Sequence, residues 1–395
     1  MTSNSTNFTG SIWTKDFILL FAGNLLMGIS FYFLISALPI YASDVLKADK
    51  SATGLALATY TIAALLIRPF AGIAVDSLGR KVIFIWAFLA FTIVTGGYTL
   101  ATTIFILATL RFAHGLAWGA SSTAGTTIAV DLIPPARRGE GIGHFGLAMT
   151  LAMAIGPAIG LWLSSDGKYD SMFITGFAIC ATGFLMILFI KYPPFNPHKE
   201  NRGFKWKNLI EVKSLIPSFN VIFTQITYGG LISFIALFGI DIGIHNPGLF
   251  FLVYAGSIFL GRTFSGRVFD KQGPDKVITF GLLMLVVGFI TLPMIQNYYG
   301  FLGSAFLLGL GNGVAIPAFQ TMVNNMVEVH RRGAANSTYF TIFDLGIGIG
   351  MALIGFLSEM MSLSSAFFIC SALCFTALVY FKALTLKYYQ RNRVN

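Results

Sequence analysis

Long uncharged stretches separated by short polar segments dominate the chain. A helix needs about 20 apolar residues to cross the hydrocarbon core of a bilayer. Two stretches, Val82–Val130 with 49 residues and a single charge, Arg111, and Val277–Val327 with 51 uncharged residues, are each long enough for two helices, the first pair turning near Gly96–Gly97. Single helices are predicted over Phe17–Ser43, Ser51–Asp76, Gly141–Ser165, Ser171–Ile190, Ser214–Ile240, Ile242–Phe269, Gly333–Ser358 and Met360–Phe381. The pattern therefore predicts an all-α protein with twelve membrane-spanning helices.

One polar segment, Lys191–Lys213, divides this series in the middle. It contains three prolines and six Lys or Arg residues, and we interpret it as a linker that carries a short amphipathic helix along the membrane surface. The predicted organisation is an N-terminal six-helix bundle over 1–190, a cytoplasmic linker over 191–213 and a C-terminal six-helix bundle over 214–395.

The two halves repeat special residues at a constant spacing. Each member of one set recurs 194 positions later: Arg68, Gly72, Asp76 and Gly79 correspond to Arg262, Gly266, Asp270 and Gly273. The same spacing joins Gly54 to Gly248, Gly115 to Gly309, Gly119 to Gly313, Arg137 to Arg331, Arg138 to Arg332, Gly139 to Gly333, and Gly156 to Gly350. A register kept without a gap over this distance predicts a tandem duplication of one membrane module, so the bundles should be pseudo-symmetric.

Composition agrees with a membrane protein. Hydrophobic residues form 55% of the 395 residues and charged residues only 11%, whereas soluble domains carry about 25% charged residues. The cysteines Cys180, Cys370 and Cys374 all lie in apolar runs, where small buried hydrophobes are expected rather than disulfides or metal ligands. We therefore expect no metal and no cofactor.

The positions of the basic residues predict the orientation. Of the 26 Lys and Arg residues, 20 fall on the side of the termini and the linker, and only Lys47, Lys50 and Lys168 fall on the other side. This bias places both termini in the cytoplasm, and we expect the inner membrane of a bacterium. The net charge of +10 then reflects topology and contact with anionic membrane lipids, which argues against nucleic-acid binding.

Three motifs resemble those of the major facilitator superfamily. The run Gly72-x-x-x-Asp76-x-x-Gly79-Arg80-Lys81 is similar to the loop 2–3 signature of that superfamily, and Arg111-x-x-x-Gly115-x-x-x-Gly119 is similar to its second motif. Gly156-Pro157-Ala158-Ile159-Gly160 resembles the core of its antiporter motif, although Ala152 and Leu161 stand where two further glycines are usual. The resemblance covers the whole chain and implies the twelve-helix drug or metabolite:proton antiporter branch.

The resemblance also implies a cytoplasmic latch between the halves that favours the outward-open state. Asp76 stands where a carboxylate can accept bonds from helix N–H groups and from an arginine such as Arg80. The other residues that match this latch are Gly72, Gly79, Asp131, Arg138, Asp270, Glu328 and Arg331. The alternative is a set of surface charges that fix topology.

Charged residues inside the predicted helices are candidates for proton coupling. Arg68 and Arg262 lie about two turns from a helix end, so we expect them to be structural and to extend to the cytoplasmic face. Arg111 lies about 13 Å into its helix, too deep for that, and should face a wet cavity or a partner. Asp344, about 16 Å deep, can exchange a proton during transport, or form a static ion pair with Arg111, or cap a loosened helix. His114 can assist, or be a hydrogen-bonded structural histidine.

Polar and aromatic residues in the helices are candidates for the substrate cavity. These are Asn24, Tyr32, Trp118, Gln225, Tyr228, Asn312 and Gln320, and for each one alone hydrogen bonding between helices is the alternative. In the antiporter-like motif, Gly156 and Pro157 should bend the helix, and Gly160 should allow close approach to a neighbour from the other half.

These features predict a secondary transporter, not an enzyme. Two bundles would rock about a central site and export a small organic molecule or drug in exchange for protons. The alternative is a proton-coupled symporter that imports a metabolite, since one fold serves both. A membrane enzyme or receptor is a third class, but the sequence offers no catalytic cluster or large soluble domain. The expected partners are the substrate, protons and lipids, and the fold usually acts as a monomer.

Overall fold

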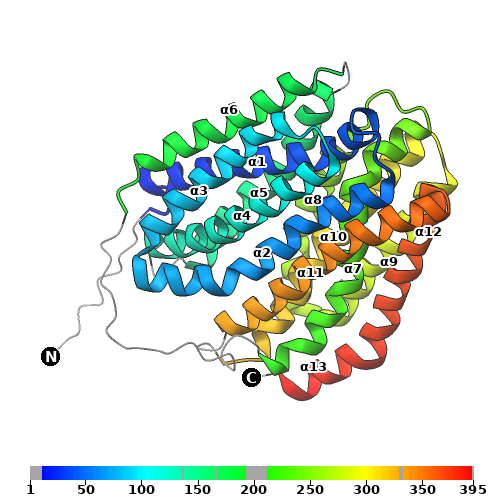
Figure 1. Cartoon of the computed structure of the whole chain (residues 1–395). Helices are drawn as coiled ribbons and strands as arrows, with labels where there is room; N and C mark the ends of the chain where they lie inside the picture. Colours follow the sequence, from blue (N-terminus) through cyan, green and yellow to red (C-terminus); the bar gives the residue numbers. More distant parts are fainter. Residues whose placement is uncertain (1–10, 135–137, 165–166, 193–210, 329–331, 394–395) are drawn as a thin grey trace.

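The computed structural model describes residues 11–134, 138–164, 167–192, 211–328 and 332–393, and within these ranges it contains helices and no strand (Figure 1). Twelve helices are long and apolar enough to cross a membrane, which confirms the predicted number. Their bounds are α1 Lys15–Asp44, α2 Lys50–Leu78, α3 Arg80–Gly97, α4 Ile104–Leu132, α5 Arg138–Ser164, α6 Tyr169–Leu188, α7 Val212–Asp241, α8 Leu249–Gln272, α9 Pro274–Met294, α10 Tyr298–Asn325, α11 Arg332–Met360 and α12 Leu363–Tyr380. A π-helical turn at Phe381–Thr385 and α13, Leu386–Asn392, continue α12.

Short connections make successive helices antiparallel, so the bundle has two ends. We call the end at which α1 and α7 begin the terminal face, and the other end the opposite face. At the terminal face, Gly79 joins α2 to α3 with φ +97°, and Gly273 joins α8 to α9 with φ +74°. Both values lie in the left-handed region that favours glycine, which explains why this pair recurs in the repeat.

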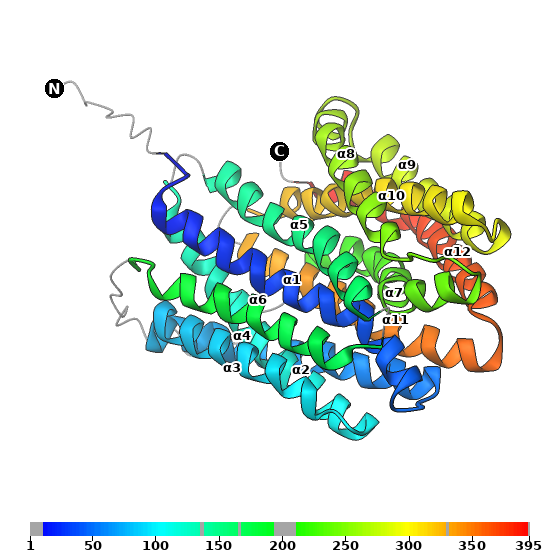
Figure 2. The ribbon, with the colours of Figure 1, turned by 90° about the horizontal axis from the view of Figure 1, so that it is seen from above.

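The helices form two bundles that meet along a few helices. α1 to α6 pack on one another, as do α7 to α12, and between the bundles α2 lies against α11, α5 against α8 and α1 against α7. Figure 1 shows α2 beside α11, and the view in Figure 2 shows α5 and α1 on the side of the first bundle that faces the second. The pairs α2–α11 and α5–α8 are equivalent in the two repeats.

Paired glycines fix the same helix crossing in each bundle. A Cβ atom on Gly115 of α4 would lie 2.1 Å from the carbonyl oxygen of Tyr60 in α2, and one on Gly309 of α10 would lie 2.3 Å from that of Tyr254 in α8. Each distance is far below a van der Waals contact, so these crossings require glycine. Tyr60 and Tyr254 are themselves 194 positions apart, which gives the duplication a structural basis.

Some predicted boundaries differ from the observed ones. The helix expected from Ile242 begins only at Leu249, because Gly243 adopts φ +79° and a short loop containing Pro247 precedes the helix. The last helix extends beyond the expected Phe381 through the π-helical turn and α13. The amphipathic helix expected in the linker falls mainly on 193–210, which lie outside the described residues.

Candidate functional site

An ion pair joins the two bundles near the middle of the helices. Nη1 of Arg68, in α2, contacts Oδ2 of Asp344, in α11, and both side chains are only partly exposed. Arg68 lies ten residues before the end of α2 and Asp344 twelve residues after the start of α11, so both are about 15–18 Å from the terminal face. The prediction that Arg68 extends to that face is wrong, because the carboxylate of the other bundle lies within reach at the same depth.

Arg111 occupies an aromatic cage inside the first bundle. Its side chain is fully buried, and among the described residues its three guanidinium nitrogens make no hydrogen bond of ordinary geometry, although the Tyr98 hydroxyl lies close by. The guanidinium carbon lies 4.5 Å from the ring centroid of Tyr60 and 5.9 Å from that of Phe31, and Trp118 stacks on Phe31 at 4.9 Å. Cation–π attraction therefore compensates part of the desolvation of this charge. The alternative of a direct ion pair between Arg111 and Asp344 is wrong, since Asp344 pairs with Arg68.

His114 lies one turn after Arg111 and is equally buried. Its Nδ1 is 3.1 Å from the hydroxyl of Tyr98, its Nε2 is 3.5 Å from the hydroxyl of Thr95, and the ring of Phe91 packs on it at 4.0 Å. Both ring nitrogens of His114 therefore have polar neighbours, Thr95 in α3 and Tyr98 in the turn that follows α3. This geometry is that of a hydrogen-bonded histidine in a packed core.

Tyr60 connects the arginine cage with the ion pair. The Arg111 guanidinium group lies over its ring, and its buried hydroxyl has no hydrogen-bonding partner among the described residues. The charges of Arg111, Asp344 and Arg68 all act on that hydroxyl. The three residues expected to couple protons therefore lie in two clusters, Arg111 with His114 and Asp344 with Arg68, and the charges of both clusters act on Tyr60.

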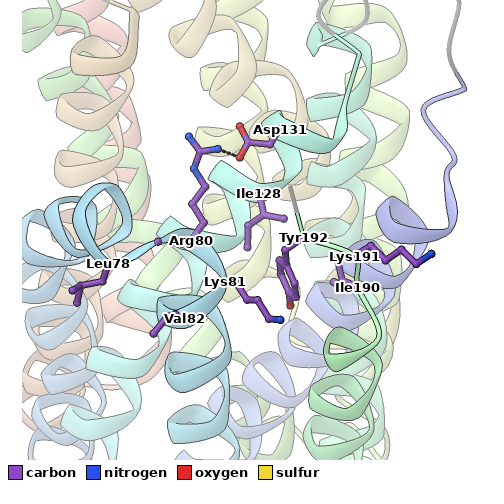
Figure 3. A pocket seen from close by; sticks show the side chains of 10 residues that line it. Leu78, Arg80, Lys81, Val82, Ile128, Asp131, Ile190, Lys191 and Tyr192 are labelled. Atoms are coloured by element: carbon purple, nitrogen blue, oxygen red, sulfur yellow. Dashed lines mark ion pairs between the residues drawn. The ribbon is translucent and has the colours of Figure 1, made fainter. Parts of the chain in front are cut away.

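At the terminal face a second ion pair lies in a hollow of about 550 Å³ (Figure 3). Nη1 of Arg80, at the start of α3, contacts Oδ2 of Asp131, at the end of α4. Lys81 lies over the ring of Tyr192 at 5.5 Å. Burial raises the pKa of Tyr192, whose hydroxyl stays neutral and donates to the Ile187 carbonyl at 2.8 Å. Arg80 and Asp131 therefore contact each other within one bundle.

The other residues expected in the latch are only partly described. The side chains of Asp76, Arg138 and Asp270, and the whole of Arg331, lie outside the described residues. Glu328 is exposed after the end of α10. A Cβ atom on Gly72 would meet nothing within 4 Å, so this glycine is not required by packing in the structure.

The residues expected in the substrate cavity fall into four places. Trp118 belongs to the Arg111 cage, and Asn24 is buried in α1. Near the junction of the bundles, the Tyr228 hydroxyl donates to Sδ of Met153 in the other bundle at 3.0 Å, and Asn312 donates to the hydroxyl of Tyr254 at 2.7 Å. Tyr32 also lies there because its side chain interacts with that of Tyr228, and Gln225 is buried one turn before Tyr228. Gln320 lies farther away, where it donates to Asn336 at 3.1 Å.

The antiporter-like motif packs within its own bundle. Cβ atoms on Gly156 and Gly160 of α5 would lie 2.7 Å from the Ile29 carbonyl and 2.6 Å from the Phe33 carbonyl of α1. The expected approach of Gly160 to the other half is therefore wrong, because α1 of the same half fills that side. Pro157 lies inside α5 between the two glycines.

The remaining described contacts between the bundles concentrate toward the opposite face. Glu359 at the end of α11 accepts a hydrogen bond of 2.6 Å from the backbone N–H of Lys50 at the start of α2, and Nζ of Lys50 is 3.8 Å from Asp241. A Cβ atom on Gly54 would lie 2.4 Å from the Met351 carbonyl, and one on Gly248 would lie 3.3 Å from Cα of Ala158. The helices α2–α11 and α5–α8 are therefore in close contact from that face to the middle.

Known proteins that resemble this chain include several transporters. The family model of the Major Facilitator Superfamily matches residues 20–246 and 218–394. The chain is 24% identical to the "Multi-drug resistance efflux pump PmrA homolog" of Lactococcus lactis, with 88% of the chain and 90% of that protein covered. It is 23% identical to the "Staphylopine export protein" of Staphylococcus aureus, with 87% and 89% covered. A bacterial homologue of the human lysosomal transporter Spinster, solved facing inward and occupied, shares the fold with a TM-score of 0.80, 17% identity, and 96% and 98% covered.

Proposed function

The chain belongs to the Major Facilitator Superfamily, and on that premise we propose that it exports a small organic molecule in exchange for protons. Members of this superfamily are transporters and not enzymes, so the chain is a multi-pass membrane transporter. Relatives described as multidrug efflux pumps or as an export protein favour the outward direction. The basic residues of the terminal face favour a cytoplasmic location for both termini, in the inner membrane of a bacterium. The protein would act as a monomer.

The ion pair between Arg68 and Asp344 is the observation that carries the proton-coupled part of the proposal. Asp344 is a carboxylate about halfway through the bundle, and its partner Arg68 belongs to the other half of the molecule. Protonation of Asp344 would remove its charge and weaken its hold on Arg68, which lowers the free energy needed to separate α2 from α11. Loss of the proton would restore the pair. Proton binding at this position would therefore change how strongly the halves adhere.

The described contacts support a conformation that is open toward the terminal face. Lys50, Gly54 and Gly248 join the halves at or near the opposite face, and Arg68 joins them in the middle. With cytoplasmic termini this is the inward-facing state, in which substrate would enter from the cytoplasm. The pair of Arg80 and Asp131 would belong to the latch that closes the cytoplasmic side in the other state. Arg111 and His114 would tune the coupling through Tyr60.

Transport in proteoliposomes under an imposed pH gradient tests the proposal. The native chain should move at least one compound from a panel of lipophilic cations, carboxylates and siderophores against the proton flux, and Asp344→Asn should lose the gradient-driven component by about tenfold while still equilibrating that compound. Asp275→Asn is the matched control, because Asp275 pairs with Lys382 within one bundle at the terminal face and should retain full coupling. Movement of substrate together with protons would instead support the importing symporter. Normal coupling in Asp344→Asn would exclude Asp344 as the proton carrier.

A further inference from the structure

Three arginines lie inside the membrane-spanning helices, and they differ in what neutralises them. Arg111 is fully buried in its aromatic cage, so a ligand between the bundles does not reach it. Arg68 is paired with Asp344. Arg262, in α8, is exposed although it lies ten residues, about 15 Å, from the end of its helix. Among the described residues, its guanidinium group donates one hydrogen bond, from Nη1 to the hydroxyl of Thr150 in α5 at 3.1 Å, and this partner is neutral.

The repeat explains why Arg262 lacks an acid. Arg262 corresponds to Arg68 and Thr150 corresponds to Asp344, each at the spacing of 194. Both arginines cross from the second helix of their repeat to the fifth helix of the other repeat, so the geometry of the two junctions is the same. At one junction the arginine meets a carboxylate, and at the other it meets a hydroxyl. The prediction that Arg262 extends to the terminal face is therefore wrong, since it contacts α5 instead.

The described groups around Arg262 do not neutralise its charge. The titratable side chains near it are four tyrosines, Tyr32, Tyr228, Tyr254 and Tyr339, which are uncharged as phenols, and no described carboxylate is among them. They come from α1, α7, α8 and α11, hence from both bundles. The guanidinium group offers several donors in a plane that matches a carboxylate, while the tyrosine rings provide flat apolar surfaces and hydroxyl groups.

We propose that Arg262 binds an acidic group, a carboxylate, on the transported organic molecule, at the junction of α5 and α8 where it now contacts Thr150. This inference rests on the proposed function, because it names the substrate class of the same transporter. The acid would supply the charged partner that Thr150 does not, and the ring of Tyr32, which is the partly exposed one of the four tyrosines, would contact the apolar body of the molecule. Arg262 is exposed in the structure, which leaves its guanidinium group accessible to a ligand.

Equilibrium binding to the purified full chain in detergent, at fixed pH and without a gradient, tests the inference. The probes are dansylglycine, an amphipathic carboxylate, and its uncharged methyl ester. The native chain should bind the acid about tenfold more tightly than the ester, the size of effect that one charge-assisted pair provides. Arg262→Gln should reduce this ratio to about one, and Arg262→Lys should restore part of it.

The second variant uses the repeat itself. Thr150→Asp reproduces the acid of the other junction and would pair Arg262 within the protein, so the preference for the acid should also disappear. Lys382→Gln, which removes a cation from the terminal face, controls for net charge and should keep the preference. The inference is wrong if the native chain binds acid and ester equally, or if Arg262→Gln and Thr150→Asp keep the native ratio. A failure of proton-driven transport in proteoliposomes would contradict the proposed function without changing this binding ratio.

Discussion

Thr150 and Asp344 occupy equivalent positions in the two repeats, 194 residues apart, and each contacts the equivalent arginine of the opposite bundle. The two junctions between the bundles therefore share one geometry but differ in charge. The α2–α11 junction carries an acid that can be protonated, whereas the α5–α8 junction leaves an arginine without an acid. One junction suits proton binding and the other suits binding of an anion.

The energetic coupling of Arg68 and Asp344 should be measurable in a double-mutant cycle. Arg68→Ala and Asp344→Ala should each lower the unfolding temperature in detergent, and the double variant should be less destabilised than the sum. We expect an interaction energy of about 1–2 kcal/mol, at the lower end for a buried pair because both side chains are partly exposed. Thermal unfolding followed by the fluorescence of the five tryptophans provides the measurement. Additive effects would mean that the pair contributes nothing to the described conformation.

Replacement of Arg111 should reduce transport without lowering the stability of the fold. Arg111 is a fully buried cation that makes no hydrogen bond of ordinary geometry among the described residues, so Arg111→Met should leave the unfolding temperature unchanged or raise it. Transport should nevertheless fall by about tenfold or more, because functional sites keep charges that cost stability. Arg111→Lys, which keeps a charge over the Tyr60 ring, is the matched control and should retain more transport. A variant that both unfolds readily and fails to transport would point to a structural role.

Two glycines of the sequence motifs should respond differently to the same change. Gly115→Ala places a methyl group 2.1 Å from the Tyr60 carbonyl and should cost about 1–3 kcal/mol, with loss of folded protein in size-exclusion chromatography. Gly72→Ala meets nothing within 4 Å in the described conformation and should fold normally. If Gly72→Ala still reduces transport, the glycine is needed in the other conformation, as expected of a latch. Normal folding of Gly115→Ala would show that the crossing of α2 and α4 can widen.

The contact of Glu359 with the first turn of α2 should bias the conformational equilibrium. Its carboxylate accepts the backbone N–H of Lys50 and lies at the positive end of the α2 dipole, an interaction of about 0.3–1 kcal/mol. Glu359→Gln should therefore shift the population about two- to fivefold away from the described state. Reactivity of single cysteines introduced at the opposite face measures this shift, and Asp275→Asn should leave it unchanged. An unchanged reactivity would exclude the contact as a determinant of the equilibrium.

The fold follows from the sequence to a large extent, because length and apolarity alone determine that a helix spans a membrane. The repeat is also visible in the sequence. Gly79 and Gly273 illustrate the reason, since both adopt a left-handed backbone conformation that few residues other than glycine tolerate. The loop before α8 was not predicted, because Gly243 and Pro247 lie in a run without charged residues that would mark the end of a membrane-spanning helix.

The candidate site was less predictable, since depth in a helix does not say in which direction a side chain points. An ion pair with Arg111 was one of the alternatives for Asp344, yet Asp344 pairs with Arg68, and nothing in the local sequence around Asp344 indicates which helix it faces. The repeat offered one signal, because the spacing that links Arg68 to Arg262 also links Thr150 to Asp344. Tyr60, on which the charges of both clusters act, carries no charge of its own and is not marked by composition.

The close backbone contact at Gly54 has a mechanical consequence. Because Gly54 meets Met351 and Gly355 near the opposite face, this part of α2 and α11 approaches most tightly and acts as a fulcrum. About 20 residues of each helix extend from there toward the terminal face, forming lever arms of roughly 30 Å. A small rotation at the glycines then produces a displacement that grows along the arms, with Arg68 and Asp344 partway along them. Arg68 and Asp344 therefore lie where a modest force acts with leverage, and the largest displacement occurs at the terminal face.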